Sequence, residues 1–290
     1  MRVIDDPDLG NWLTRAEAEA FCERLGVNVS QRDAAKLGAL VRAYLGKIPF
    51  HNVHMLVRYG REPSRAEILA DMGRGLGGPC NVMNPFFAAL LAQLGYDVTL
   101  LSGSMQQPDC HIALCVRFGE HAYWADVGNG HPYLEPIRLG DESPKFSAGL
   151  GYRLVARPSC GYVIEHQFDR GGPWKTCYTF TLEPRPHRFF AAMIAEHHTK
   201  PGFGPFMTGL RLIRVPDGSL TAIRDDVLLT GRDVIQKHHL ASKNALIDAV
   251  TEHFGDIDLP IRDAVKVLER QGITMFSSRS ERNDEDVLRE

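Results

Sequence analysis

The chain has no excess of positive charge. Its 33 lysines and arginines are outnumbered by 36 aspartates and glutamates, which gives a formal net charge of -3. A nucleic-acid-binding surface needs clustered Lys and Arg to neutralise phosphates. We therefore expect no nucleic-acid partner.

Long apolar segments are also missing, and we expect no export signal. No run approaches the roughly 18 apolar residues of a membrane-spanning helix. The first residues, "MRVIDDPDLGNW", carry two early aspartates and no apolar stretch of the kind found in signal peptides. The six cysteines include no C-x-x-C pair, and without an export signal reduced thiols are the better expectation. We expect a cytoplasmic protein that does not bind membranes.

The sequence does contain enough apolar material for a folded core. Of its 290 residues, 44% are hydrophobic and 24% charged, as in ordinary globular proteins. Residues 1–95 are predicted to be mostly helical. Thr14 with Glu17 and Ser64 with Glu67 form two capping-box patterns. Residues 83–94 then carry apolar side chains at helical spacing.

The apolar periodicity changes after residue 95. Short apolar segments at 96–103, 111–118 and 122–128 are separated by turn residues, which predicts antiparallel strands. This pattern continues to about residue 184, and a hairpin turn is predicted at Asp217-Gly218. Helices are predicted near 187–199 and 262–273. Strands and helices do not alternate regularly, so a doubly wound parallel sheet is disfavoured and a mixed α+β fold is expected.

Cys80 follows the glycine-rich segment "GRGLGGP" and precedes an apolar helix. The glycines fit G-x-G-x-x-G, but a dinucleotide site needs a strand before them, and a capped helix precedes them here. A cysteine at a helix start is favoured as a thiolate, although buried cysteines are often only structural. Because Pro85 is best tolerated in a first turn, the helix should start near Asn84 or kink early, with Cys80 at or just before its start.

His111 and Asp126 could activate such a cysteine. His111 begins one predicted strand, and Asp126 lies in the apolar segment "YWADVGNG" of the next. A carboxylate in such a segment needs a partner, and pairing of the two strands would bring both side chains together. Nucleophile, base and orienting acid would then be Cys80, His111 and Asp126. The remaining histidines lack the spacing of zinc ligands, so no metal is expected.

Several segments resemble the arylamine N-acetyltransferase family. They are "RGLGGPCNVMN" around Cys80, "HIALCV" at His111, "ADVGNG" at Asp126 and "KIPFHN" at residues 47–52. The chain also departs from the family pattern. His51 stands where the family usually has Glu, Pro79 replaces an aromatic residue, and Arg74 is displaced towards the N-terminus.

The resemblance implies a fold and a reaction. It implies an N-terminal helical bundle at 1–95, a central antiparallel β-barrel at 96–190 and a C-terminal α/β lid at 191–290, with a cysteine-protease-like catalytic core. Acetyl-CoA or another acyl-CoA is the implied cosubstrate, with no bound cofactor, and an amine, hydroxylamine or hydrazine is the acceptor. The implied sites are Phe50 and Phe206 for the acceptor, and Gly128 and Gly130 for the approaching thioester.

The same residues are also consistent with other functions. Some family members join amines to larger acyl chains, and a thiol hydrolase or transglutaminase can use the same triad. A non-catalytic small-molecule-binding protein on this scaffold is a further alternative. Because His51 and Pro79 change the predicted pocket, we expect the acceptor to differ from small arylamines.

Overall fold

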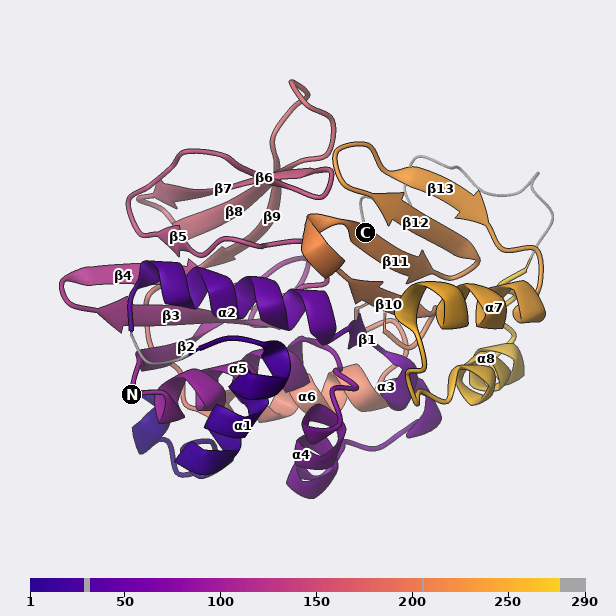
Figure 1. Ribbon diagram of the computed structural model, residues 1–290, viewed down its shortest axis with the longest axis horizontal. Helices are drawn as coiled ribbons and strands as arrows, with labels where there is room; N and C mark the ends of the chain where they lie inside the picture. Colours follow the sequence, from indigo (N-terminus) through magenta and orange to yellow (C-terminus); the bar gives the residue numbers. More distant parts are fainter. Residues whose placement is uncertain (29–31, 205, 277–290) are drawn as a thin grey trace.

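Two antiparallel sheets and a set of packed helices make up the protein (Figure 1). The computed structural model describes residues 1–28, 32–204 and 206–276. The larger sheet has eight strands in the order β5-β4-β3-β2-β9-β8-β7-β6, and the smaller has five in the order β1-β10-β11-β12-β13. The mixed α+β class is confirmed. The eight-stranded sheet is a curled half-barrel rather than a closed barrel, because its edge strands β5 and β6 do not pair with each other.

The last of the N-terminal helices packs on the larger sheet, and two of the others pack against that helix. Both predicted capping boxes are present: the side chains of Thr14 and Ser64 accept from the backbone N–H groups of Glu17 and Glu67. The helices are α1 (Arg15–Leu25), α2 (Ala34–Lys47), α3 (Val53–Val57), α4 (Arg65–Gly73) and α5 (Cys80–Gln93), after a 3-10 turn at Val3–Asp5.

Helix α5 lies at the centre of the molecule and packs on β2 and β3. It begins at Cys80, so the expectation that Cys80 lies at the helix start is confirmed, while a start near Asn84 is wrong because Pro85 lies inside the helix. An internal proline costs about 3 kcal/mol. Every residue from Cys80 to Ala92 is buried, and each large apolar side chain gains roughly 1.5–3 kcal/mol on burial. Packing therefore outweighs the local penalty.

The larger sheet is built from hairpins. Strands β3 and β4 pair from Phe118↔His121 to Leu114↔Ala125, so the predicted antiparallel strands are present here and the turn residues between them form a tight turn. Asp126 is the residue that directly follows the last paired residue of β4. The strands are β2 (Asp97–Ser104), β3 (His111–Phe118), β4 (His121–Ala125), β5 (Ile137–Arg138), β6 (Lys145–Ser147), β7 (Leu150–Arg157), β8 (Gly161–Gln167) and β9 (Lys175–Phe180).

The smaller sheet joins distant parts of the chain. Strand β1 (Phe50–His51) comes from the predicted helical region but pairs with β10 (Arg211–Arg214). The turn predicted at Asp217-Gly218 is present, and both residues have positive φ. The other strands are β11 (Leu220–Arg224), β12 (Val227–Gly231) and β13 (Gln236–His239). The division at 95 and 190 stays a prediction.

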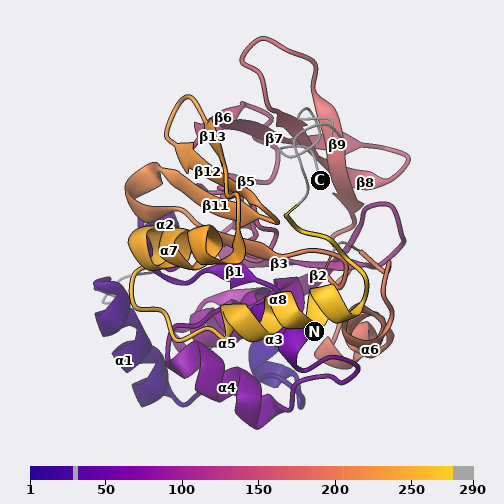
Figure 2. The same ribbon diagram turned by 90° about the vertical axis from the view of Figure 1, so that its right-hand side faces the viewer.

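Two C-terminal helices cover the smaller sheet (Figure 2). Leu246 of α7 and Leu268 of α8 share a buried apolar cluster with Leu212 and Ile223 of the sheet. The helices of the C-terminal half of the chain are α6 (Ala191–Thr199), α7 (Lys243–Phe254) and α8 (Ile261–Arg270), with 3-10 turns at His187–Phe190 and Pro216–Gly218. Among the described residues, no helix is long and apolar enough to cross a membrane.

Candidate functional site

The nucleophile candidate, Cys80, is the first residue of helix α5 and is 2% exposed. The loop before it is held against strand β1: the N–H of Gly78 donates to the Pro49 carbonyl, and the N–H of His51 donates to the Gly78 carbonyl. Gly77 makes this approach possible, because a Cβ there would lie 1.8 Å from the Pro49 oxygen. The sulfur is thus fixed at the positive end of a helix, where first-turn N–H groups have no helical acceptor.

His111 lies beside Cys80 at the start of strand β3 and is 2% exposed. Its Nε2 is 2.7 Å from Oδ2 of Asp126, which leaves Nδ1 for the sulfur. Burial alone would lower the pKa of His111, but the charge and hydrogen bond of Asp126, together with a hydrogen bond to Cys80, raise it to about 10. The site therefore favours an imidazolium next to the thiol.

Asp126 is 1% exposed and fully hydrogen-bonded. Its Oδ1 accepts from Asn84 Nδ2 at 2.8 Å and from the Gly128 N–H at 3.0 Å. Its Oδ2 accepts from the Tyr178 hydroxyl at 2.9 Å as well as from His111. A carboxylate out of water is stable only with such partners, and here they also fix the direction in which it faces His111.

Asn84 is one of two residues outside the triad that hold this arrangement together. Its Nδ2 also donates to the Ile112 carbonyl at 2.6 Å, and its Oδ1 accepts from the Val127 N–H at 3.0 Å. Asn84 thereby links α5, β3 and the loop after β4. It belongs to the cysteine motif, but the motif alone does not indicate this linking role.

Tyr178 is the second such residue, and no sequence pattern points to it. It lies on β9, which pairs with β2, and its ring is 4.9 Å from that of His111. Its hydroxyl accepts from Trp124 Nε1 at 2.9 Å while it donates to Asp126. Only the order of strands in the sheet brings it to the site, and no local pattern encodes that order.

The glycines expected near the thioester lie close to the nucleophile. A Cβ on Gly128 would be 2.9 Å from Cys80 Cα and 2.7 Å from Asn84 Nδ2. Gly130 has φ +80° and lies against Phe50. The rings of Phe50 and Phe206 are 6.0 Å apart. The structure therefore brings all four of these predicted residues into one neighbourhood.

A cleft of about 370 Å³ opens from this neighbourhood between the two sheets. Gly130 and Ile213, which both border Phe50, are among the residues that line it. Apolar side chains form most of its wall, and it also carries five polar or charged residues: His131, Asp169, Arg170, Arg224 and Asp233. Its volume lies within the range of pockets that hold drug-sized ligands.

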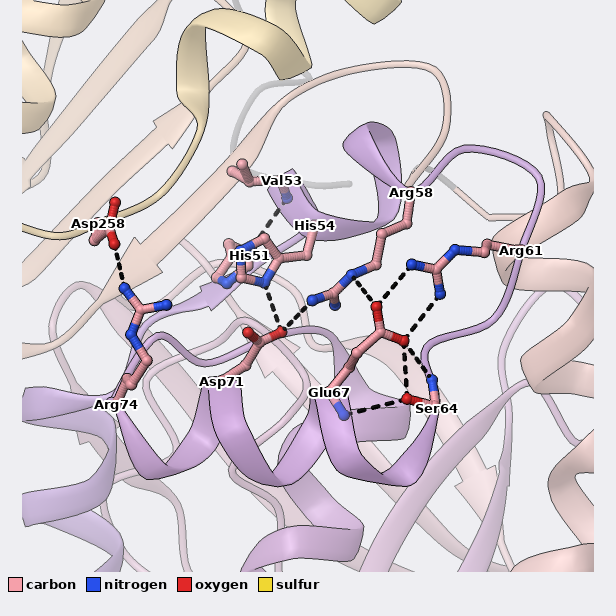
Figure 3. Close-up of polar contacts among 10 residues, drawn as sticks. All are labelled: His51, Val53, His54, Arg58, Arg61, Ser64, Glu67, Asp71, Arg74 and Asp258. Atoms are coloured by element: carbon pink, nitrogen blue, oxygen red, sulfur yellow. Dashed lines mark hydrogen bonds and ion pairs between the residues drawn. The ribbon is translucent and has the colours of Figure 1, made fainter.

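A network of charged groups joins helix α4 to α3 and the residue that follows α3, close to the loop that precedes Cys80 (Figure 3). Asp71 Oδ2 is 2.9 Å from both His54 Nδ1 and Arg58 Nη2. Arg58 also reaches Glu67, with Nε 3.4 Å from Oε1. Arg58 and Asp71 are mostly buried, so this pair is screened from water.

Two of the three residues that depart from the family pattern, His51 and Arg74, lie at the edge of this network. His51 is fully buried, and its Nδ1 accepts from the Val53 N–H at 3.0 Å. Burial, with a smaller contribution from His54, lowers the pKa of His51 to about 3, so the ring is neutral. Arg74 points away from the network and pairs with Asp258 at the surface (Figure 3).

The described residues also offer no site for a metal. In residues 1–28, 32–204 and 206–276, no three or more His, Cys, Asp or Glu side chains are grouped so as to hold a metal ion. The six cysteines are free thiols.

Comparison with known proteins gives one family. Residues 33–264 match the model of a family described as N-acetyltransferase. The arylamine N-acetyltransferase of Mycolicibacterium smegmatis is 30% identical over 268 residues, covering 87% of this chain and 92% of that protein. The proansamycin X synthase of Amycolatopsis mediterranei (strain S699) is 29% identical over 186 residues, covering 58% and 69%.

Solved structures share the fold. The M. smegmatis arylamine N-acetyltransferase has a TM-score of 0.74 and 27% identity, covering 86% of this chain and 97% of that one. The Mycobacterium marinum enzyme in complex with CoA has a TM-score of 0.76 and 24% identity, covering 87% and 97%. At that identity the second likeness shows the fold alone.

Proposed function

The chain belongs to the arylamine N-acetyltransferase family, a family of enzymes, and from this premise we propose that it transfers an acyl group from acyl-CoA through an acyl-cysteine on Cys80. The acceptor is an amine, hydroxylamine or hydrazine, and acetyl-CoA is the simplest donor. The observation that carries the proposal is the buried chain of contacts from Cys80 through His111 to Asp126.

The first half of the reaction acylates the enzyme. The Cys80 thiolate attacks the thioester carbonyl, and His111 holds the proton that came from the thiol. The C–S bond to CoA then breaks, and the departing thiolate takes that proton. The raised pKa of His111 supports this step, because the imidazole can take up and hold the thiol proton. The first-turn N–H groups of Cys80 and Asn81 are suited to stabilise the developing oxyanion.

The second half transfers the acyl group to the acceptor. The amine nitrogen attacks the acyl-cysteine carbonyl and gives its proton to His111. The C–S bond to Cys80 breaks, which releases the amide and restores the thiolate and imidazolium. The two substrates thus bind in turn, which predicts ping-pong kinetics.

Substrates would reach the sulfur along the four residues predicted for them. Gly128 lets the loop after β4 pack directly against the Cys80 backbone, and Gly130 lines the cleft between the sheets. Phe50 and Phe206 offer aromatic surfaces to the acceptor. No bound cofactor is needed for this chemistry. We also propose the cytoplasm as its location, since acyl-CoA is available there.

An amide synthase that acts on a larger acyl chain is the second candidate. The cleft of about 370 Å³ is far larger than an acetyl group requires, and most of its wall is apolar. One relative with 29% identity is named proansamycin X synthase. A bulky acyl group on Cys80 could extend past Gly130 into this cleft.

Intact-protein mass spectrometry with a panel of acyl-CoAs tests both candidates. We expect a mass increase equal to the acyl group in the native chain, none in Cys80→Ala, and an unchanged result in Cys110→Ala. Subsequent addition of an amine should remove the acyl group and yield the amide. Acylation that persists in Cys80→Ala would refute the proposal. Rapid loss of the acyl group to water without any amine would favour a hydrolase.

A further inference from the structure

Helix α5 begins without a side-chain cap. Its N-cap residue is Pro79, which makes no side-chain hydrogen bond to the first turn. By contrast, Thr14, Asp33 and Ser64 cap the N-termini of α1, α2 and α4 through their side chains. A missing cap costs roughly 0.5–2 kcal/mol and lets a first turn fray. The turn that carries Cys80 therefore needs another constraint.

Asn81, the second residue of α5, provides a contact that can serve this purpose. Its side-chain Nδ2 lies 3.2 Å from Nε2 of His198, a residue 117 positions away in the last turn of α6. Both residues are only 2% exposed. The contact joins the nucleophile's own turn to a separate helix.

His198 is held in the form that accepts this hydrogen bond. Because the amide of Asn81 donates, Nε2 of His198 must carry no proton. Burial lowers the pKa of His198 to about 4, and the positive charge of Arg58 contributes to that lowering. Arg58 is itself fixed by Asp71 and Glu67, as Figure 3 shows.

The surroundings of His198 restrict its movement. Its carbonyl accepts from the Gly60 N–H at 3.3 Å, which ties α6 to the turn after α3. Between His198, Arg58 and Pro79 lies a cavity of only about 10 Å³, room for no more than one water molecule. His198 cannot move far without displacing the loop before Cys80.

We propose that Asn81 and His198 form a positioning pair that fixes the first turn of α5. The pair sets the direction of the Cys80 sulfur towards His111 and of the Asn81 backbone N–H towards the reacting carbonyl. This inference rests on the proposed function, which supplies the reacting carbonyl. The side chains of Asn81 and His198 act through the turn, so they are positioning residues and not catalytic ones.

Replacement of either partner tests the proposal. Asn81→Leu and His198→Phe remove the hydrogen bond while keeping apolar bulk. His198→Gln places an acceptor oxygen near the original Nε2 position. We expect the first two variants to lower kcat about tenfold with KM for acyl-CoA within about twofold, since misplacing an oxyanion donor affects mainly the transition state. His198→Gln should recover most of the loss, and Thr199→Val, one residue further along α6, should behave as the native chain does.

Alkylation of Cys80 by iodoacetamide gives a readout that needs no substrate. The rate per folded molecule should fall in Asn81→Leu and His198→Phe, and the double variant should be no slower than either single variant, because both remove one interaction. The proposal is wrong if His198→Phe keeps its native alkylation rate and kcat, or if kcat falls only in proportion to the unfolded fraction. It is also wrong if His198→Gln is as impaired as His198→Phe. Absence of acylation in the native chain would instead refute the proposed function.

Discussion

Mild acid should destabilise this protein, because several histidines are buried in the neutral form. His51, His166, His197 and His198 are at most 3% exposed. Burial is the main cause that lowers their pKa values to about 3 for the first three and about 4 for His198. In the unfolded chain each would take up a proton near pH 6.5. Above about pH 6.5 these rings are neutral in both states, so their burial leaves the free energy of unfolding independent of pH. Below that value the unfolded chain takes up protons, and the free energy of unfolding falls.

The size of the effect follows from proton linkage. Between about pH 7.5 and about pH 5.5, each such histidine lowers the free energy of unfolding by about 1.4 kcal/mol. His111 opposes this, because its pKa is raised to about 10. His111 stays protonated in the folded protein, whereas the unfolded chain is mostly neutral at this position above about pH 6.5. Unfolding therefore releases a proton from His111, and lowering the pH opposes that release by about 1.4 kcal/mol. The net loss is about 4 kcal/mol, a large part of the 5–15 kcal/mol that stabilises a typical domain.

Urea unfolding followed by circular dichroism at a series of pH values measures this loss. Near pH 5.5 the slope should correspond to a net uptake of at least about three protons on unfolding, because burial also lowers the pKa values of His131 and His187. His166→Gln, which removes one buried titrating ring, should reduce that uptake by about one proton. His121→Gln, at an exposed position on β4, should leave the slope unchanged. A free energy of unfolding that stays constant from about pH 7.5 to about pH 5.5 would refute the reasoning.

Four further outcomes are expected. Gly128→Ala should lower kcat at least about a hundredfold, because the added Cβ would lie 2.9 Å from Cys80 Cα; native activity would show that the loop yields. Tyr178→Phe removes a donor to Asp126 and should lower kcat about tenfold without raising KM, whereas an unchanged kcat would show that the remaining donors suffice. Arg74→Ala should leave the alkylation rate of Cys80 unchanged, since Arg74 is paired at the surface, and a slower rate would contradict this. In a kcat/KM panel, larger or aliphatic amines should be preferred over simple anilines, and equal turnover of anilines would argue against a changed acceptor pocket.

Local sequence patterns predicted the elements that carry the site. The capping box at Ser64, the periodicity of the apolar helix and the tight turn between β3 and β4 are all encoded within about a dozen residues. The turn also sets which residues face each other across the hairpin, so the proximity of His111 and Asp126 follows from the sequence alone.

Contacts between distant segments could not be predicted in this way. Strand β1 has two residues, too few to show any period, yet it holds the loop before Cys80. Tyr178 reaches Asp126 only because β9 pairs with β2. The contact between Asn81 and His198 depends on how α6 packs against α5. At Pro85 a local rule gave the wrong prediction. Proline is expected only in the first turn of a helix, but the burial of α5 stabilises the helix despite an internal proline.

The two departures at His51 and Arg74 can be explained together. Position 51 lies within electrostatic range of Asp71, whose carboxylate already pairs with His54 and Arg58. A glutamate at position 51 would bury a second negative charge there, and Arg74 is directed to the surface, where it pairs with Asp258. A buried charge without a partner costs several kcal/mol, whereas a neutral imidazole that accepts from the Val53 N–H does not carry that cost. With Arg74 turned outward, a neutral residue at position 51 is therefore the electrostatically consistent choice.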